Sequence, residues 1–471
     1  MNAPHPPPDI DPSRVVGALS SPQVQALRAI VGREQVLLDH KARAKYAADE
    51  SPIAPVLPAA VVRVRSAEDV AAVLEFADRE RIPVTPRGAG TGKVGGAVPL
   101  YGGIVLSLER MDHLLEIDTA NRLARAEPGL VTGRLHEEVM ARGLYYPPDP
   151  NSLDTCSIGG NVATNAAGPC SMKYGATRAH VLGLQVVLAG GRRLTVGRRT
   201  TKSTTGYDLT SLIVGSEGTL AVVVEVTVRL TPHPGDRKTL FVPFSSASEA
   251  VGSLVALHRA GVVPAAAEFF DRHALEAMSN VVPIPARAEA ALLFEVHGTP
   301  AVLEATLERF AEVLGPRSLE VAVAGDGEGL RRLWAARKEV SVLIKERFRW
   351  RRSEDIAVPP GRLPRIVDFL ESLRARTDLH IVAYGHAGDG NLHVNFLYQE
   401  DERHDEVERA AAALFHETIA LGGTLSGEHG IGATKRRFLG LEQTGALISV
   451  QKQLKRSLDP HDIMNPGKVF P

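Results

Sequence analysis

Glycine and proline place the strongest constraint on the fold of this chain, because they crowd into residues 86–103. The spacing Gly90-x-Gly92-x-x-Gly95 formally matches a dinucleotide-binding fingerprint, which requires a helix to begin within it. The further glycines and Pro99 forbid such a helix. We therefore expect a loop whose backbone amides bind an anionic pyrophosphate, as in anion-binding nests. A flexible surface loop is the alternative.

Three further segments combine glycine, small residues and hydroxyl groups. They are residues 147–168, Lys202–Leu209 and Gly215–Thr219. Segments with few large side chains bury no core of their own, but they let the backbone approach a large planar ligand closely. Four such segments in the first half of the chain predict a cofactor that is wrapped by loops.

Two histidines lie on either side of Asp389-Gly390, a favoured pair for a two-residue type I′ hairpin turn. A turn centred on this pair makes His386 face His393, with Cβ atoms about 4.5–5.5 Å apart. Two imidazoles at that separation can converge on one metal ion. Strand alternation then puts Asn395 on the face of His393. Either histidine alone could be structural, but the pair in this register favours metal ligands.

The composition is that of a globular protein with two or three domains, with 471 residues, 44% hydrophobic, and a net charge of -1. Aromatic residues are few and the charge is balanced, so the composition does not indicate a nucleic-acid-binding surface. Cys156 and Cys170 cannot supply the four thiolates of an iron–sulfur cluster, so any electron carrier must be another cofactor. We find neither a signal peptide nor a membrane-spanning run, and expect a cytoplasmic protein. Peripheral attachment to the inner face of the membrane stays open.

Hydrophobic periodicity predicts mixed helices and strands from Ala59 onward, after a helical leader from Pro22 to about Ala48. Ser66 and Thr132 are expected to cap two helices, and Thr231–Gly235 to form a domain boundary. The architecture is therefore two α/β or α+β domains. Strands are expected at Val61–Val64, Ile82–Pro86, Ile104–Leu108, Val181–Leu188 and Thr219–Leu230, and later helices at Ala247–Ala260, Ala301–Leu314, Gly329–Phe348, Leu363–Thr377 and Arg403–Leu421.

These segments resemble the flavin-binding domain of the vanillyl-alcohol oxidase superfamily, and the C-terminal half resembles its D-2-hydroxyacid dehydrogenase branch. That branch includes D-lactate dehydrogenases, the flavin subunit of glycolate oxidase and D-2-hydroxyglutarate dehydrogenases. The motifs that carry the resemblance are Arg-Gly-Ala-Gly-Thr-Gly (87–92), Ile-Gly-Gly-Asn-Val-Ala-Thr-Asn-Ala (158–166), Thr-Thr-Gly-Tyr-Asp-Leu (204–209), Gly-Ser-Glu-Gly-Thr-Leu (215–220), His-Ala-Gly-Asp-Gly-Asn-Leu-His (386–393), Ser-Gly-Glu-His-Gly-Ile-Gly (426–432) and Asn-Pro-Gly-Lys (465–468).

The resemblance implies a two-domain α+β flavoprotein of vanillyl-alcohol oxidase type. It assigns residues 1–56 to an N-terminal leader and helix, and residues 57–234 to an FAD-binding domain. Residues 235–430 would form an α/β cap domain that binds substrate and metal. Residues 431–471 would return to the FAD-binding domain.

The resemblance also implies FAD in an extended form, with the 87–92 loop on the pyrophosphate. Members that attach FAD covalently through this loop carry a histidine where Thr91 stands, so we expect the flavin to be noncovalent. The candidate cofactor-binding residues are Arg87, Gly88, Ala89, Gly90, Thr91, Gly92, Pro148, Asp149, Ser157, Gly160, Asn161, Thr164, Asn165, Gly215, Glu217, Gly218 and Asn465.

Oxidation of a 2-hydroxy acid needs a hydride acceptor, a base for the hydroxyl proton and positive charge for the carboxylate. Glu428 and His429 lie in a glycine-rich loop that follows an expected helix end. The resemblance implies that His386, His393 and Glu428 bind a divalent metal, which polarises the substrate hydroxyl. Zinc is the expected ion, with manganese and iron as alternatives. The resemblance implies that His429 is the general base.

Arg337 and Ser341 are four residues apart on the helix expected over 329–348, and therefore share a face. The family uses the matching arginine for the substrate carboxylate, which a guanidinium binds through two parallel hydrogen bonds. Asn395 would be an additional donor to the substrate. Arg337, Ser341 and Asn395 join His429 in the expected catalytic set.

One departure from the family bears on the substrate. D-2-hydroxyglutarate members carry a lysine where Ser353 stands, two places before an aspartate in a segment that runs into a proline. The missing side chain would hold a distal carboxylate, so D-lactate or glycolate is favoured unless a neighbouring arginine replaces it. Those neighbours are Arg349, Arg351 and Arg352, which with Lys345 and Arg347 are expected first to form a solvated face.

Three rival functions remain. The chain could be a D-2-hydroxyglutarate dehydrogenase, a noncatalytic flavin subunit of a larger oxidase, or a zinc hydrolase that uses the same three metal ligands without flavin. For a dehydrogenase, the electron acceptor could be a quinone, a cytochrome, an electron-transfer flavoprotein or a partner subunit. A homodimer is a further open alternative.

Overall fold

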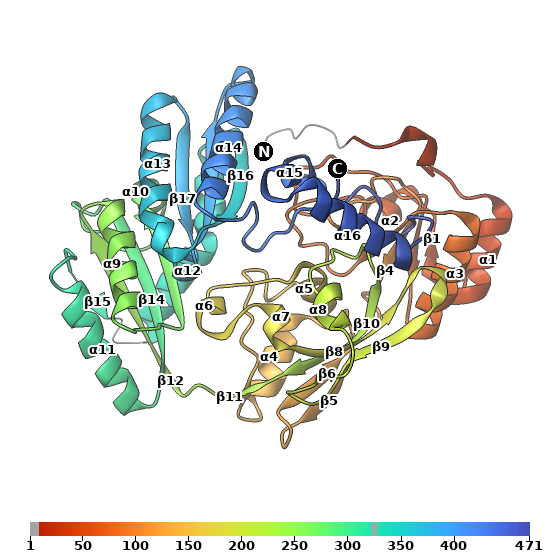
Figure 1. The fold of residues 1–471 in the computed structure, drawn as a ribbon, viewed down its shortest axis with the longest axis horizontal. Coiled ribbons are helices and arrows are strands. Elements are labelled where there is room, and N and C mark those ends of the chain that lie inside the picture. The colour runs from red at the N-terminus through yellow and green to blue at the C-terminus, as the bar shows by residue number, and fades with distance from the viewer. Residues whose placement is uncertain (1–8, 321, 324–326) are drawn as a thin grey trace. The chain divides into compact units, whose positions relative to one another are not determined.

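The structure, a computed structural model, describes residues 9–320, 322–323 and 327–471. These residues form two compact units, each treated separately below (Figure 1). Unit 1 comprises Gly168–Gly175 and Pro234–Glu428; unit 2 comprises residues 9–167, Ala176–His233 and His429–Pro471. The chain passes between units on either side of Gly168–Gly175, within the domain boundary expected at Thr231–Gly235, and between Glu428 and His429. The sequence does not predict that Gly168–Gly175 belongs to unit 1.

The first sheet of unit 2 has the strand order β1-β2-β4-β3, and β2 and β3 run parallel to β4. Helix α3 (Ala67–Glu80) packs on this sheet through buried residues that include Val70, Val73, Leu74 and Ala77. The Ser66 side chain accepts the backbone N–H of Asp69 at 3.1 Å, which confirms the predicted cap. The strands are β1 (Val36–Leu37), β2 (Ala60–Arg63), β3 (Val84–Arg87) and β4 (Ile104–Ser107).

The second sheet of unit 2 is antiparallel, with the order β5-β6-β10-β8-β9. Apolar residues of helices α4 (Thr132–Met140), α5 (Ile158–Thr164) and α8 (Leu209–Ile213) share its core. The strands are β5 (Leu114–Asp118), β6 (Leu123–Ala126), β8 (Val181–Val187), β9 (Arg193–Gly197) and β10 (Val222–Arg229), and a separate ribbon pairs β7 (Leu144–Tyr145) with β11 (Thr231–Pro232).

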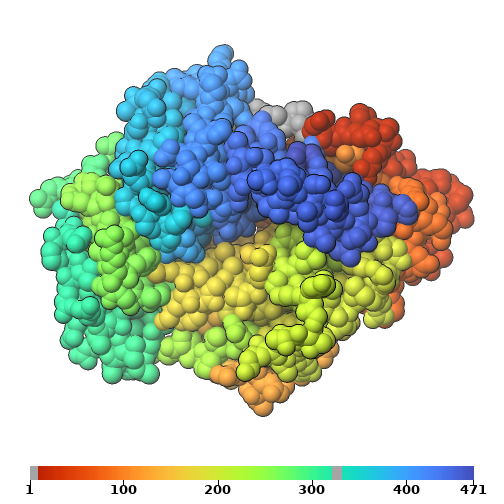
Figure 2. Space-filling model, in the orientation of Figure 1, coloured from red at the N-terminus to blue at the C-terminus, as the bar shows by residue number. Residues whose placement is uncertain are grey.

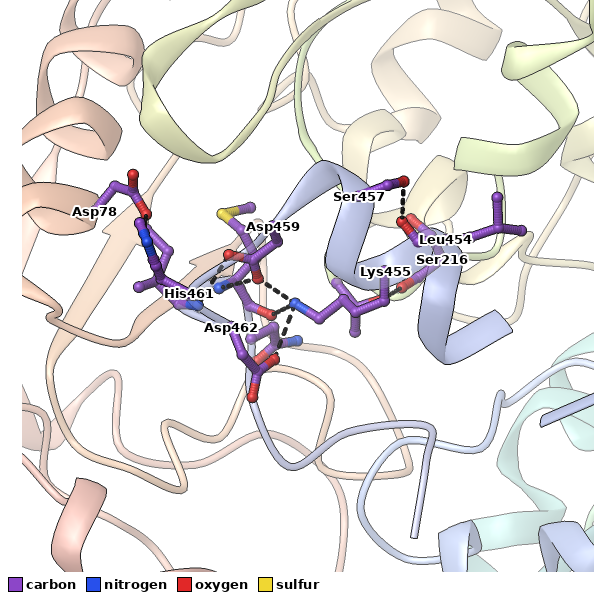
Figure 3. A network of polar contacts seen from close by, with 12 residues as sticks. Asp78, Ser216, Leu454, Lys455, Ser457, Asp459, His461 and Asp462 are labelled. Atoms are coloured by element: carbon purple, nitrogen blue, oxygen red, sulfur yellow. Dashed lines mark hydrogen bonds and ion pairs between the residues drawn. The ribbon is translucent and has the colours of Figure 1, made fainter. Parts of the chain in front are cut away.

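The C-terminal helix α16 (Gly445–Leu458) is tied into unit 2 by a buried ionic network (Figure 3). The Lys455 ammonium donates to the carboxylate of Asp459 and, at 2.8 Å, to the carbonyl of Met464. His461 contacts Asp78 of α3 at 2.8 Å. Helix α16 lies at the surface in Figure 2. Three of its apolar residues, Leu447, Val450 and Leu454, are exposed.

Unit 1 is built on one seven-stranded antiparallel sheet with the order β15-β12-β14-β13-β17-β18-β16 (Figure 1). Helices α9 (Ala247–Arg259), α11 (Pro300–Leu314), α13 (Leu363–Arg376) and α14 (His404–Ala420) pack on one face, and α10 (Arg272–Met278) and α12 (Gly327–Glu346) on the other. The strands are β12 (Asp236–Phe244), β13 (Ala266–Asp271), β14 (Ala290–Gly298), β15 (Ala322–Val323), β16 (Trp350–Ala357), β17 (His380–Gly385) and β18 (Asn391–Tyr398).

Two expectations for unit 2 are wrong. The leader is not one helix, because Gly32 takes a φ of 88° and ends α1 (Ser21–Val31). The chain then forms β1 and the short helix α2 (His40–Ala44). Thr132 does not cap α4 but is its first residue, and its hydroxyl instead accepts a hydrogen bond from Asn161 at 2.7 Å.

The predicted two-residue turn at Asp389-Gly390 is also wrong. A short 3-10 helix over Ala387–Asp389 connects β17 to β18, and the register pairs His393 with Tyr384 rather than with His386. The cause is local hydrogen bonding, since the carbonyl of His386 accepts the backbone N–H groups of both Asp389 and Asn391. His386 therefore lies just beyond the end of β17.

No helix in the described part of the chain is both long enough and apolar enough to cross a membrane.

Candidate functional site

The three predicted metal ligands converge in unit 1 despite the changed register. The imidazole rings of His386 and His393 lie with centroids 5.3 Å apart and planes at 83°. The Glu428 Oε1 atom is 3.6 Å from the Nε2 of His386 and 3.5 Å from the Nε2 of His393. Both histidines are buried, and one ligand atom from each of the three residues lies within 4.8 Å of the others. Two imidazole nitrogens and a carboxylate oxygen fit a divalent metal such as zinc.

Glu268 of β13 joins this group to Arg337 of α12. Its Oε1 accepts the Nδ1–H of His386 at 2.5 Å, and its Oε2 accepts the Nε–H of Arg337. All three side chains are buried. Burial by itself would raise the pKa of Glu268, but the positive charges of Arg337 and His386 outweigh it and hold the pKa at about 2. The carboxylate is therefore ionised in any ordinary buffer.

The other guanidinium nitrogens of Arg337 make no hydrogen bond to any residue that the structure describes. The guanidinium carbon also lies 5.6 Å from the ring centroid of Tyr384, whose strand pairs with β18. Glu268 thus holds the guanidinium through its Nε–H, and the remaining N–H groups can donate hydrogen bonds to a planar carboxylate.

Asp355 of β16 supports the other side of the group. Its Oδ1 accepts Asn391 Nδ2 at 2.6 Å, and its Oδ2 accepts Ser426 Oγ at 2.9 Å and the backbone N–H of Glu428 at 3.0 Å. The Nδ1 of His393 is 3.6 Å from Oδ1. Sequence reasoning missed Asp355 and Glu268 as site residues. The sequence does contain a sign that Glu268 has a functional partner. It lies in the apolar run Ala-Ala-Glu-Phe-Phe (266–270), and a charged residue that is buried with such a run needs a partner for its charge.

The structure places only some of the predicted catalytic residues beside the group of metal ligands. Asn395 is fully buried on the face of His393, as strand alternation predicts, and its Oδ1 has no hydrogen-bond partner within the described residues. Ser341 instead accepts a hydrogen bond from Arg351 at 2.8 Å, and the structure does not bring it into the group around Glu268. His429 is the first residue of unit 2 after the break, and its role as base stays a prediction.

The arginines near Ser353 do not all form the solvated face that the sequence predicts. Arg352 is buried and forms ion pairs with Glu354 and Glu408, so its guanidinium is already compensated. It pairs with Phe396 and therefore lies on the face opposite His393. Arg349 fits the expectation, since it is half-exposed and lies 3.3 Å from Asp401.

In unit 2, the loop after β3 contains no helix, as its glycines predict. A Cβ atom at Gly88 would lie 2.3 Å from the Oγ of Ser157, the residue that caps α5. Gly90 has a φ of 77°, and a Cβ there would lie 2.1 Å from the Arg87 guanidinium. A side chain is disfavoured at Gly88 by the Ser157 hydroxyl and at Gly90 by the positive φ, so the backbone of residues 88–90 stays nearly bare, as the close approach of an extended dinucleotide requires. The residues present fit FAD.

Several predicted cofactor residues use their side chains within the protein. Glu217 accepts the backbone N–H groups of Ile431 and Gly432 at 2.8 Å each. Burial raises its pKa to about 7, although those two hydrogen bonds act in the opposite direction. Asn465 donates to the carbonyls of Gly96 and Glu217, and its buried Oδ1 has no partner in the described chain. The Glu217 side chain therefore holds the backbone at Ile431 and Gly432 in place, whereas Asn465 keeps its Oδ1 available as an acceptor.

The α5 segment shows the same pattern. Thr164 donates to the carbonyl of Gly160, and the side chain of Asn165 accepts the backbone N–H of Arg178 at 2.9 Å. The carbonyl of Pro148 contacts His136 at 2.9 Å. Residues 202–209, expected to add to the cradle, are exposed, and Tyr207 reaches 96% exposure.

Comparison with solved structures gives the fold. The chain superposes on p-cresol methylhydroxylase with a TM-score of 0.80 at 16% identity, covering 97% of this chain and 98% of that one. A 4-ethylphenol oxidase from Gulosibacter chungangensis gives a TM-score of 0.77 at 17% identity, with coverage of 97% and 98%. The fold is therefore the two-domain α+β flavoprotein fold of vanillyl-alcohol oxidase type, as the sequence predicts.

Two family models match the chain, the FAD binding domain over residues 58–197 and the C-terminal domain of FAD linked oxidases over residues 233–469. The glycolate oxidase subunit GlcD of Bacillus subtilis is 35% identical, over 95% of this chain and 96% of that protein. The D-lactate dehydrogenase of Archaeoglobus fulgidus is 37% identical, over 90% and 95%. The chain belongs to the FAD-linked oxidase family.

Proposed function

We propose that this chain is an FAD-dependent dehydrogenase that oxidises a D-2-hydroxy acid, D-lactate or glycolate, to the 2-oxo acid. The convergence of His386, His393 and Glu428 in unit 1, with Arg337 joined to the same buried group, carries the proposal. A metal-binding donor set linked to an available guanidinium suits a substrate that has adjacent hydroxyl and carboxylate groups. The names of the relatives GlcD and D-lactate dehydrogenase agree with it.

Each residue then has a defined task. Bound FAD would supply the hydride acceptor for C2, and a divalent metal held by His386, His393 and Glu428 would supply the charge that polarises the hydroxyl. Arg337 binds the carboxylate through its guanidinium nitrogens, which fixes which hydrogen on C2 is presented. The buried Oδ1 of Asn395 offers an acceptor beside His393, and its amide the additional donor. His429 takes the hydroxyl proton as the general base.

The residues near Ser353 support a monocarboxylate. Ser353 is exposed on β16, and Arg352 lies on the opposite face with its charge already paired. One observation favours D-2-hydroxyglutarate as a second candidate. Arg351 pairs with Leu397 and so shares the face of His393, where it contacts Ser341.

Anaerobic bleaching of the bound flavin tests the function. D-lactate or glycolate should bleach the flavin absorbance of the metal-loaded protein, and L-lactate should bleach it much more slowly. Faster bleaching by D-2-hydroxyglutarate would select the second candidate. Bound flavin that none of the four acids bleaches would instead indicate a noncatalytic subunit, and a purified protein without flavin absorbance would favour the hydrolase. Reoxidation by quinone, cytochrome or electron-transfer flavoprotein then identifies the acceptor.

A further inference from the structure

Glu268 lies where two functional side chains meet. It is completely buried in β13, directly opposite Leu293 of β14, and points to the face that α12 covers. Its two carboxylate oxygens have different partners, His386 on one and Arg337 on the other. Neither partner is a neighbour in sequence, so this single side chain connects three separate elements of unit 1.

The hydrogen bond to His386 determines which imidazole nitrogen can bind a metal. Glu268 takes the Nδ1–H of His386, which leaves Nε2, the nitrogen that lies 3.6 Å from the Glu428 carboxylate, as the atom that a metal would bind in place of a proton. A carboxylate on the far nitrogen fixes the tautomer and ring orientation of a ligating histidine and increases its basicity.

The hydrogen bond to Arg337 determines which guanidinium edge is available. Glu268 occupies Nε–H, and the Nη groups have no partner among the residues that the structure describes. Rotation of the Arg337 side chain would break this buried ion pair, which is costly because it leaves an uncompensated charge. The carboxylate-binding edge is therefore held in one orientation.

We propose that Glu268 is a positioning residue that sets the metal-binding nitrogen of His386 and the carboxylate-binding edge of Arg337 together. The distance between the two anchor points of a 2-hydroxy acid is then fixed by one side chain. The effect of Glu268 on Arg337, the Arg337 half of the inference, rests on the proposed function. Its effect on His386, the His386 half, requires only that His386, His393 and Glu428 bind a metal.

Unit 1 supplies a matched control. Glu295 of β14 is also buried, lies two residues from Leu293 on the same face, and contacts His297 at 2.6 Å. It forms the same kind of carboxylate–histidine pair, but His297 is not one of the three converging ligands. Glu295→Gln therefore reproduces the loss of a buried charge without touching the metal group.

The experiment compares Glu268→Gln and Glu295→Gln as FAD-loaded full-length proteins. Zinc affinity is measured by competition with a chelator, and KM and kcat are measured for the acid that bleaches the flavin. We expect Glu268→Gln to weaken zinc binding about 10–100-fold and to lower kcat/KM about 100-fold. Glu295→Gln should leave zinc affinity within twofold. If Glu268→Gln does not fold, Glu268→Asp, which is too short to hold both partners, is judged by the same criteria.

A second comparison separates positioning from general damage. In an Arg337→Ala background, Glu268→Gln should still weaken zinc binding but should raise KM no further, because the residue through which it acts on the carboxylate is absent. An unchanged zinc affinity in Glu268→Gln, or an equal loss in Glu295→Gln, would overturn the proposal. If no 2-hydroxy acid reduces the wild-type flavin, the proposed function fails, and the zinc measurements alone decide the His386 half.

Discussion

The Asp355 carboxylate accepts the backbone N–H of Glu428 at 3.0 Å, so a residue of edge strand β16 fixes the loop that carries a predicted metal ligand. The same carboxylate accepts Ser426 Oγ and Asn391 Nδ2. Each of these three neighbours is a donor, and the Asp355 side chain is fully buried. Only an acceptor with two oxygens satisfies all of them.

Asp355→Asn should therefore weaken metal binding while FAD stays bound. The substituted amide presents its NH2 group to neighbours that are themselves donors, so the loop at Glu428 must shift. We expect zinc affinity to fall about 10–100-fold, as measured by chelator competition. Ser426→Ala, which removes only one of the three donors, should have a much smaller effect. Equal zinc affinities for Asp355→Asn and the wild type would remove Asp355 from the support of the site.

His393→Ala should retain FAD and lose both metal and turnover. The imidazole is one of three converging ligands in unit 1, whereas the candidate flavin residues that the structure places lie in unit 2. Flavin absorbance and metal content of the purified variant give the two readouts. His404→Ala, which removes a histidine that contacts Tyr398 on the same strand, is the control and should keep its metal. Full activity in metal-free His393→Ala protein would exclude the metal from the mechanism.

Arg337→Lys should raise KM for the hydroxy acid while the charge is kept. An ammonium can replace one hydrogen bond to Glu268, but it cannot also present two parallel N–H groups to a carboxylate. The loss of one charge-assisted hydrogen bond, about 1.5–3 kcal/mol, corresponds to a reduction in kcat/KM of about 10–150-fold. Steady-state kinetics with D-lactate or glycolate measures the change. The assigned role of Arg337 is wrong if both KM and kcat are unchanged.

Local signals account for the parts of the fold that could be predicted. Ser66 and the spacing of the apolar residues after it place α3, and glycine content excludes a helix from the loop after β3. The hairpin strands were predictable, but the turn was not, because the backbone of His386 accepts two N–H groups in competition with the type I′ geometry. The register of β17 against β18 therefore differs from the prediction, because backbone hydrogen bonds to His386 set it rather than the turn preference of Asp389-Gly390.

The candidate site was only partly predictable for a related reason. His386, His393 and Glu428 could be grouped from sequence, whereas the residues that support them lie on other strands. Glu268 and Asp355 reach the group through pairings of β13 with β17 and of β16 with β18. Such long-range pairings leave no local pattern, and only the presence of a carboxylate in an apolar strand hints at them.

Lys455→Met should destabilise unit 2 without altering the chemistry of unit 1. The Lys455 ammonium is buried against Asp459 and lies 3.2 Å from Asp462, so its removal leaves a buried carboxylate partly uncompensated (Figure 3). We expect a loss of about 3 kcal/mol in the free energy of unfolding, measured in urea. Lys452→Met on the same helix loses only an exposed contact to Pro471 and should change stability by less than about 0.5 kcal/mol. Similar effects of both variants would contradict the buried network.

Glu217 should make stability fall as the pH rises towards neutrality. Burial raises the pKa of Glu217 from 4.5 to about 7, so the folded protein keeps a proton that the unfolded chain has already lost. Its contribution is therefore greatest below pH 4.5, declines as the pH increases, and is fully lost above about pH 7. Glu217→Gln cannot titrate, so the stability difference between wild type and variant isolates this group.

With FAD held constant, that difference should change by about 3 kcal/mol between pH 4.5 and pH 7, in the direction that disfavours the wild type at higher pH. It should then stay flat to pH 8. Any constant offset reflects the hydrogen bonds to Ile431 and Gly432, because an amide offers only one oxygen to the two backbone N–H groups. Urea unfolding at several pH values measures the slope. A difference that does not depend on pH would show that the Glu217 carboxyl titrates alike in the folded and unfolded chains, and the inference that burial holds its proton near neutrality would be wrong.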